Sequence, residues 1–333
     1  MKEFARRYRW ELFIVAMLAI AVIWSSGLSP FYLAAQQLLY SSRNFVFTGI
    51  MAMGLMMIIV TGEMDLSLPS ILAVCTVALA KFSSWSIPLA LALPAIVGVG
   101  ALLGFLNGVL VTRLKLPSLA VTLGTMGAYR GLAFIIGSEV GYTSFNGQYL
   151  WLGASNIGKS AIPVMLIVYV VCAAAFVLLA HFTTFGRRCF AVGNNAPAVR
   201  YSGGNVELIK TAAYVIGGIT AALGAWVFIG QFGSARGDNA NGVILGVITA
   251  VVLGGVDING GKGTVGGVLL SILFLWTLRN GMGLANIAGP VEQLIIGVFL
   301  VTSVIISNLP EMDVVRRIRV RRERVVSAPD KLR

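Results

Sequence analysis

Charged residues are scarce in this chain of 333 residues. Only 11% of the residues are Asp, Glu, Lys or Arg, 57% are hydrophobic, and the mean hydropathy is +0.88. A soluble domain carries about 25% charged residues because its surface faces water. The composition therefore excludes a soluble enzyme, a disordered protein and a disulfide scaffold. It predicts a protein whose surface mostly faces lipid.

Histidine and cysteine are also nearly absent. His181 is the single histidine, which excludes a histidine-based metal cluster and leaves no basis for a Ser-His-Asp triad. Cys75, Cys172 and Cys189 have neither CxxC nor metal-binding spacing and are interpreted as packing residues. The sequence therefore predicts no cofactor, no metal site and no enzyme activity.

The net charge of +12 comes largely from the two ends of the chain. The basic residues there include Lys2, Arg6, Arg7, Arg9, Arg316, Arg317, Arg319, Arg321, Arg322 and Arg324. Long stretches between these blocks are almost uncharged. Charge placed in this way flanks membrane spans and does not form a nucleic-acid recognition surface.

Ten apolar runs alternate with polar segments. A helix needs about 20 residues to cross a bilayer. Eight runs are of that order, at 12–28, 44–61, 88–111, 117–137, 161–182, 209–230, 264–283 and 290–307. Two shorter runs, 69–82 and 243–255, are bordered by glycine, proline and acidic residues. We therefore expect an all-α integral membrane protein with about ten transmembrane helices, some of them broken.

The basic residues orient the predicted bundle. If both termini are cytoplasmic, the cytoplasmic segments hold 19 of the 25 Lys and Arg residues and the opposite side holds 5. The predicted organisation is a cytoplasmic N-terminus (1–11), a transmembrane domain (12–307) with a cytoplasmic loop (183–208), and a basic cytoplasmic tail (308–333). Segment 62–68 has two carboxylates and no basic residue, so it is either a loop or a broken helix within the membrane.

Glycine is abundant, with 39 residues, and it recurs at helical spacing in two consecutive runs. The two sets are Gly100, Gly104 and Gly108, and then Gly124, Gly127 and Gly131. Such faces let helix backbones approach closely within a membrane. They predict compact packing and do not identify a solute.

One run has the letters of a nucleotide-binding loop. Residues 153–160 read GASNIGKS, which matches GxxxxGK followed by Ser or Thr. A true phosphate-binding loop follows a buried strand and opens a helix. Here polar and aromatic loop residues precede the run, Pro163 opens a membrane span, and the charge bias places the run outside the cytoplasm. We therefore predict that it binds no nucleotide.

A few polar residues lie within or beside the apolar runs. Arg130 lies deep in its run, where a charge costs about 2.5–3.5 kcal/mol, so it should face the bundle interior and meet a carboxylate or a carbonyl. It either lines a polar path or makes a buried structural contact. Asn107 is placed to share that interior, and Asp65 and Asp257 each follow a glycine by three residues beside an interrupted helix. These residues are candidates for a translocation path.

The polar segment 186–208 contains a helix signal. Asn195 can cap a short helix, Pro197 suits its first turn, and Gly203 with Gly204 can end it. The pattern predicts a helix of about seven residues at the cytoplasmic mouth of the bundle. Such a helix either enters a groove on a soluble partner or is only a solvated connector.

Five longer stretches resemble a known family. They are TGEMDLSLPS (61–70), PSLAVTLGTMGAYRGLA (117–133), FGRRCFAVGNNAPAVRYSGGNV (185–206), FGSARGDNANG (232–242) and ITAVVLGGVDINGGKGTVGG (248–267). Together they resemble the permeases of ATP-binding-cassette (ABC) importers for ribose, xylose, rhamnose and the sugar-like signal autoinducer-2. The stretch 232–242 is most similar to the half-permeases of autoinducer-2 and rhamnose systems.

The resemblance implies a role and partners. The chain would be a permease subunit in the inner membrane that forms the pathway for a monosaccharide or a sugar-like signal. ATP hydrolysis would take place on separate cytoplasmic subunits, and a periplasmic binding protein would deliver the solute. A second permease, identical or a sister chain, and the membrane lipid would complete the assembly, with no nucleic acid.

The resemblance also implies roles for particular residues. The family's G-x-D-L-S pattern falls at Asp65 and Ser67, which adds Ser67 to the candidate path, although Glu63-Met64 stands where Gly-Ile is commoner. The family's coupling helix falls at roughly Asn195–Gly204. The candidate ATPase-coupling residues are Arg187, Asn194, Asn195, Ala196, Ala198, Arg200 and Gly203.

A second class of function stays open on the sequence. An ion-coupled secondary transporter of small polar solutes would need ion-binding carboxylates at broken helices. Asp65 and Asp257 are the residues that would serve it.

Overall fold

The protein is a bundle of helices. The computed structural model describes residues 9–137, 141–158 and 160–305. Within these ranges there are no strands, only two isolated β-bridges, so the predicted all-α class is confirmed. The predicted basic tail 308–333, most of the predicted N-terminal segment 1–11, and Lys159 of the nucleotide-loop look-alike lie outside the described residues.

The helices follow one another with short connections. In chain order they are α2 (Arg9–Leu28), α3 (Ala35–Ser41), α4 (Arg43–Val60), α5 (Leu68–Ser84), α6 (Leu89–Thr112), α7 (Ser118–Gly137), α8 (Gly147–Ala154), α9 (Val164–Val177), the π-helix η1 (Leu178–Phe182), α10 (Thr184–Tyr201), α11 (Val206–Phe232), α12 (Val243–Leu253), α13 (Val265–Leu284) and the helix Gly289–Ile305.

Ten apolar helices correspond to the ten apolar runs of the sequence. Seven of those described are long and apolar enough to cross a membrane, and three shorter ones are Leu68–Ser84, Val243–Leu253 and Gly289–Ile305. This set confirms an integral membrane protein. That all ten helices span the membrane, with both termini in the cytoplasm, stays a prediction.

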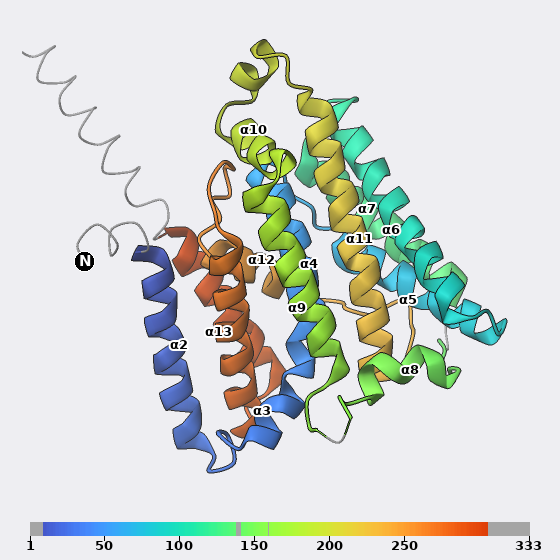
Figure 1. Cartoon of the computed structure of the whole chain (residues 1–333), viewed down its shortest axis with the longest axis vertical. Coiled ribbons are helices and arrows are strands. Elements are labelled where there is room, and N and C mark those ends of the chain that lie inside the picture. Colours follow the sequence, from blue (N-terminus) through green and yellow to red (C-terminus); the bar gives the residue numbers. More distant parts are fainter. Residues whose placement is uncertain (1–8, 138–140, 159, 306–333) are drawn as a thin grey trace, which may run out of the picture.

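Two helices form the centre of the bundle. Beyond its polar start, which holds Arg43, Asn44 and Thr48, α4 is apolar on all sides, and 83% of its most apolar 18-residue window is buried. α11 crosses the bundle beside it and packs on α4, α5 and α6 (Figure 1). α2 and α7 lie at the periphery, with only 17% of the same window buried in each. These two helices therefore present most of their surface to whatever surrounds the chain.

The two predicted interruptions are present. The chain leaves the helix between α4 and α5 at residues 61–67, and again between α12 and α13 at residues 254–264. Gly62 and Gly255 both have a φ of +82°, a conformation that favours glycine. The amide of Gly261 donates to the carbonyl of Val60 at 2.8 Å, so the two interruptions are in contact.

The short helices mark the two ends of the bundle. α3 and α8 lie at one end and α10 at the other (Figure 1). The charge bias assigns the α10 end to the cytoplasm, so we name it the inner end and the opposite one the outer end.

α10 is longer than the sequence indicates. Its first part, 184–194, lies in the segment that the sequence predicts to be a loop, but it is helical because Gly186, Cys189 and Val192 form a buried face. The backbone then breaks at Asn195 (φ −160°, ψ 85°), and a second short helix runs to Tyr201. We call this second part, residues 196–201, the inner-end helix.

Candidate functional site

A buried polar network lies at the interruption between α4 and α5. Asp65, Ser67 and Asn107 have no solvent-exposed surface. Oδ1 of Asp65 accepts from the amide of Ser67 at 2.8 Å and from its hydroxyl at 2.7 Å. The Asn107 amide nitrogen donates to the Ser67 hydroxyl at 2.8 Å. Three of the five predicted path residues therefore share one hydrogen-bond network.

The network ends on a residue that sequence reasoning missed. The Tyr129 hydroxyl lies 3.0 Å from both the Leu103 carbonyl and Oδ1 of Asn107. Nothing in the spacing of Tyr129 and Asn107 indicated this contact, because it depends on how α6 and α7 cross. Oδ2 of Asp65 is buried and has no hydrogen-bond partner among the described residues.

Arg130 lies apart from this network. Its Nη1 donates to the Gly237 carbonyl at 2.8 Å and to the Asn239 carbonyl at 2.7 Å. A carbonyl is one of the two kinds of partner that the sequence predicts for Arg130. These carbonyls belong to the segment between α11 and α12. In the same segment, hydrogen bonds from Arg236 lower the pKa of Asp238, and the charge of Arg130 adds to the effect. Arg130 therefore anchors α7 to an outer-end loop.

Asp257 is also separate from the network. Its Oδ1 accepts from the Asn259 amide at 3.0 Å, the same short turn that Asp65 makes with Ser67. Its Oδ2 pairs with Lys262 at 3.2 Å. The similar sequences around the two aspartates therefore form the same short turn at two different places in the fold. No group of three or more His, Cys, Asp or Glu side chains suited to a metal occurs among the described residues.

The inner-end helix is capped as the sequence predicts. The amide of Ala198 donates to Oδ1 of Asn195 at 3.0 Å. Gly203, with a φ of +80°, follows its last turn. Pro197 and Ala198 are exposed, and Tyr201 is 94% exposed. Tyr201 was not among the predicted coupling residues, although an aromatic at the end of a short polar helix is a recognisable docking signal.

The remaining predicted coupling residues fall into two groups. Arg187 is exposed on the first part of α10, and Ala196 is half-buried. Asn194 and Arg200 make contacts within the chain. The Asn194 amide donates to the Gly261 carbonyl at 3.0 Å, and Arg200 pairs with Glu207 at the start of α11 at 2.5 Å. α10 is thus fastened to both an interruption and a central helix.

A further ion pair extends this connection. Lys210 on α11 pairs with Glu63 of the α4–α5 interruption at 2.5 Å. Both side chains are largely buried. α10 is therefore connected to both interruptions. Its ion pair with α11, together with the Lys210–Glu63 pair, leads to the α4–α5 interruption, and Asn194 contacts the α12–α13 interruption directly.

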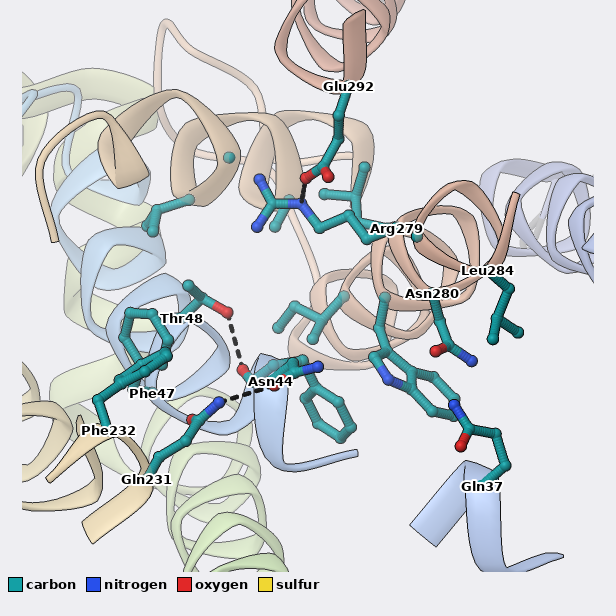
Figure 2. Close-up of a pocket in the computed structure, with 18 residues that line it drawn as sticks. Gln37, Asn44, Phe47, Thr48, Gln231, Phe232, Arg279, Asn280, Leu284 and Glu292 are labelled. Carbon is teal, nitrogen blue, oxygen red and sulfur yellow. Dashed lines mark hydrogen bonds and ion pairs between the residues drawn. The ribbon is translucent and has the colours of Figure 1, made fainter. Parts of the chain in front are cut away.

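The outer end contains a cavity of about 460 Å³ that sequence reasoning missed. Its lining combines amide, aromatic and aliphatic side chains from α3, α4, α11, α12, α13 and the helix after α13 (Figure 2). We call it the outer pocket. It is lined by Gln37, Asn44, Phe45, Phe47, Thr48, Gln231, Phe232, Gly246, Val247, Ala250, Ile272, Leu275, Trp276, Arg279, Asn280, Gly283, Leu284 and Glu292.

The sequence did carry one signal of this pocket. Its four amide residues all stand at or near helix ends on the predicted outer side: Gln37, Asn44, Gln231 and Asn280. They come from three distant parts of the sequence, the consecutive helices α3 and α4, then α11, then α13, so only the fold brings them together.

Comparison with known proteins identifies the class. Residues 37–304 match the family described as the branched-chain amino acid transport system permease component. The chain belongs to this family of transport permeases, and it is a multi-pass protein of the inner membrane. The predicted membership among importer permeases is confirmed.

Individual relatives are import-system permeases. The autoinducer 2 import system permease protein LsrD of Escherichia coli (strain K12) is 32% identical over 303 residues, which cover 90% of this chain and 92% of the relative. The protein of the same name from Shigella flexneri is similar to the same extent, 32% over 303 residues. No solved structure matches the chain.

Proposed function

We propose that the chain is the permease subunit of an ABC importer that carries a monosaccharide or a sugar-like signal into the cytoplasm. Family membership supports a transport permease, and the names of the relatives support a sugar-like solute. The observation that carries the coupling to ATP is the inner-end helix. It is capped, short, and exposes one face beyond the bundle.

The inner-end helix would dock in a groove of a separate cytoplasmic ATPase. Pro197 and Ala198 are small and exposed, so they permit close approach. Tyr201 supplies a large side chain of low conformational entropy, which is the usual anchor of such contacts. An ATPase that closes on ATP would then push on this helix.

The contacts of α10 provide a route for that push into the bundle. The pair Arg200–Glu207 joins the inner-end helix to α11, and Asn194 joins α10 to the α12–α13 loop. The pair Lys210–Glu63 continues from α11 to the α4–α5 interruption. A push along these contacts would move the two interruptions together. Because the helices are already broken there, this movement requires no further loss of helical hydrogen bonds.

A second permease, identical or a sister chain, would pack against α7. Gly124, Gly127 and Gly131 of α7 have open space where a side chain would project. Helix faces of small residues favour helix association in membranes. A periplasmic binding protein would then deliver the solute to the outer end.

The test of ATP coupling uses Ala198→Glu, with Ala154→Glu as the matched control at the outer end. Burying an unpaired carboxylate costs several kcal/mol, so Ala198→Glu should weaken ATPase association about a hundredfold or more. The measurements are copurification of the ATPase and the melting of the isolated permease. We expect Ala198→Glu to lose the ATPase without a change in melting, and Ala154→Glu to change neither. ATPase binding and transport that both survive Ala198→Glu would contradict the proposal.

An ion-coupled secondary transporter is the competing function, and the buried carboxylate of Asp65 favours it. Proteoliposomes that contain only the permease distinguish the two. Uptake driven by a proton or sodium gradient without an ATPase would establish the secondary transporter. Uptake that requires the ATPase, the binding protein and ATP would establish the importer.

A further inference from the structure

The outer pocket has the dimensions and composition of a small-molecule site. Its volume of about 460 Å³ lies within the range of about 300–1,000 Å³ that such sites occupy. Val247, Ala250, Ile272 and Leu275 form apolar walls from α12 and α13. Amide side chains and the pair of Arg279 and Glu292 also line the cavity (Figure 2). A ligand there would meet apolar and polar groups together.

Two polar atoms of the pocket residues are buried without a partner. Oε1 of Gln231, an acceptor, and Nδ2 of Asn280, a donor, have no hydrogen-bond partner among the described residues. The nitrogen of the same Gln231 amide group has a partner, because Nε2 donates to Oδ1 of Asn44 at 2.7 Å. A buried polar atom left without a partner costs about 1–3 kcal/mol. A hydroxyl, which both donates and accepts, can satisfy either of them where the side chain turns that atom toward the cavity, because each atom has almost no accessible surface as it stands.

The pocket also holds an aromatic surface in a fixed orientation. The indole nitrogen of Trp276 donates to the Ser41 carbonyl at 2.9 Å. The ring of Trp276 packs on that of Phe45, with 5.5 Å between centroids. Such a surface can accept the C–H face of a sugar ring, while the amide side chains of the lining meet the hydroxyls.

The charges of the pocket are balanced. Its lining contains one cation, Arg279, and one anion, Glu292, and the two form an ion pair of 2.9 Å. Figure 2 shows this pair at the edge of the cavity. A phosphorylated sugar would need an unpaired cation, and an amino acid would need partners for both its carboxylate and its ammonium group. The two charged side chains of the lining are paired with each other, so the pocket favours a ligand without charged groups.

We propose that the outer pocket is a solute-binding site within the permease itself, and that it takes a neutral, polyhydroxylated molecule of monosaccharide size. Gln231 and Asn280 bind hydroxyls, Trp276 packs on the carbon face, and the Arg279–Glu292 pair excludes charged solutes. The inference rests on the proposed function for the identity of the solute class. It places solute selection in the membrane subunit, in addition to any selection by a binding protein.

The experiment measures equilibrium binding to the assembled full-length permease in lipid nanodiscs. The neutral probes are D-ribose, D-xylose and L-rhamnose, and the charged comparison probes are L-leucine and ribose 5-phosphate. Gln231→Met and Asn280→Leu keep the approximate side-chain shape and remove the amide group, and Gln231→Met also removes the hydrogen bond to Asn44. Gln36→Met is the matched control, because Gln36 is the exposed neighbour of the lining residue Gln37.

We expect at least one neutral sugar to bind and both charged probes to fail. Each pocket variant should weaken sugar binding about tenfold or more, and Gln36→Met should leave it unchanged. Asn280→Asp, which keeps the shape but replaces the donor with a carboxylate oxygen, is measured beside Asn280→Leu so that a folding defect in one variant does not decide the result. Size-exclusion profiles confirm that the variants are assembled.

Three results would overturn the inference. They are sugar binding that all pocket variants retain, binding of L-leucine as tight as that of the sugars, and no binding of any neutral probe at millimolar concentration. Failure of the proposed function is distinguishable. ATP-dependent uptake that is insensitive to pocket variants rejects the pocket alone, whereas pocket-dependent sugar binding by a permease that recruits no ATPase rejects the importer alone.

Discussion

The consecutive helices α6 and α7 each carry three glycines at helical spacing, but these glycines meet different surroundings. The α6 glycines lie directly against α11: Gly104 faces the Tyr214 carbonyl, and a side chain at Gly108 would come within 2.9 Å of the Thr211 backbone. Among the described residues, nothing apart from the nearby backbone of α7 itself lies within 4 Å of the position that a Cβ atom at Gly124, Gly127 or Gly131 would occupy. Small residues at helical spacing therefore indicate that a helix is built for close approach, without identifying what approaches.

A second peripheral helix shows that the open face of α7 differs from an ordinary lipid-facing surface. α2 is as little buried as α7, and it exposes large side chains such as Ile20, Ile23 and Trp24. Large apolar side chains suit contact with lipid tails. The α7 glycines offer a flat surface, which suits contact with another helix and supports the proposed second permease.

Among the substitutions that test the difference between α6 and α7, the largest loss of stability is expected on α6. Gly104→Val places a branched side chain against the backbone of α11, where neither helix can move without breaking its other contacts. Overpacking of this kind costs about 1–3 kcal/mol or more, so the variant should give little folded permease. Gly131→Val on α7 is the control and should melt like the wild type. Equal melting of the two variants would show that α6 and α7 do not differ.

The next effect concerns association rather than folding. Gly127→Leu should leave the melting of the single chain unchanged, because the added side chain meets open space. If a second permease packs on α7, the variant should weaken that pairing about tenfold or more. Light scattering of the purified complex measures the pairing. Ile23→Ala on α2 is the control, and a pair of permeases that tolerates Gly127→Leu would place the interface elsewhere.

The sequence predicted the helices of this bundle better than their contacts. Apolar runs identify membrane helices because the requirement to hide backbone groups from lipid acts on each segment separately. The cap at Asn195 and the interruption near Asp65 were predictable for the same reason, since their signals are local. The outer pocket and Tyr129 were not, because their geometry depends on residues that lie far apart in the chain. The first part of α10 was missed because its apolar positions are too few to stand out.

A third effect tests what holds α7 at the outer end. Arg130→Leu removes the donor from the carbonyls of Gly237 and Asn239. Leaving such acceptors without a partner costs about 1–3 kcal/mol, so the loop 233–242 should loosen and transport should be lost. Arg130→Lys keeps the charge and should recover part of both. Hydrogen exchange of the loop and uptake by the reconstituted importer measure these effects, and a silent Arg130→Leu would remove Arg130 from any role in the path.

The smallest effect tests the inner contact of α7. Tyr129→Phe removes the hydroxyl that joins α7 to Leu103 and Asn107 of α6 and so to the buried network of Asp65. A hydrogen bond of this kind contributes about 0.5–1.5 kcal/mol, so the single chain should melt slightly lower while pairing with a second permease stays intact. Tyr40→Phe, at an exposed tyrosine, is the control. This combination would show that α7 is held to its own chain by one face and leaves its glycine face free. A loss of pairing with unchanged melting would reverse that assignment, because Tyr129 would then act at the interface between permeases.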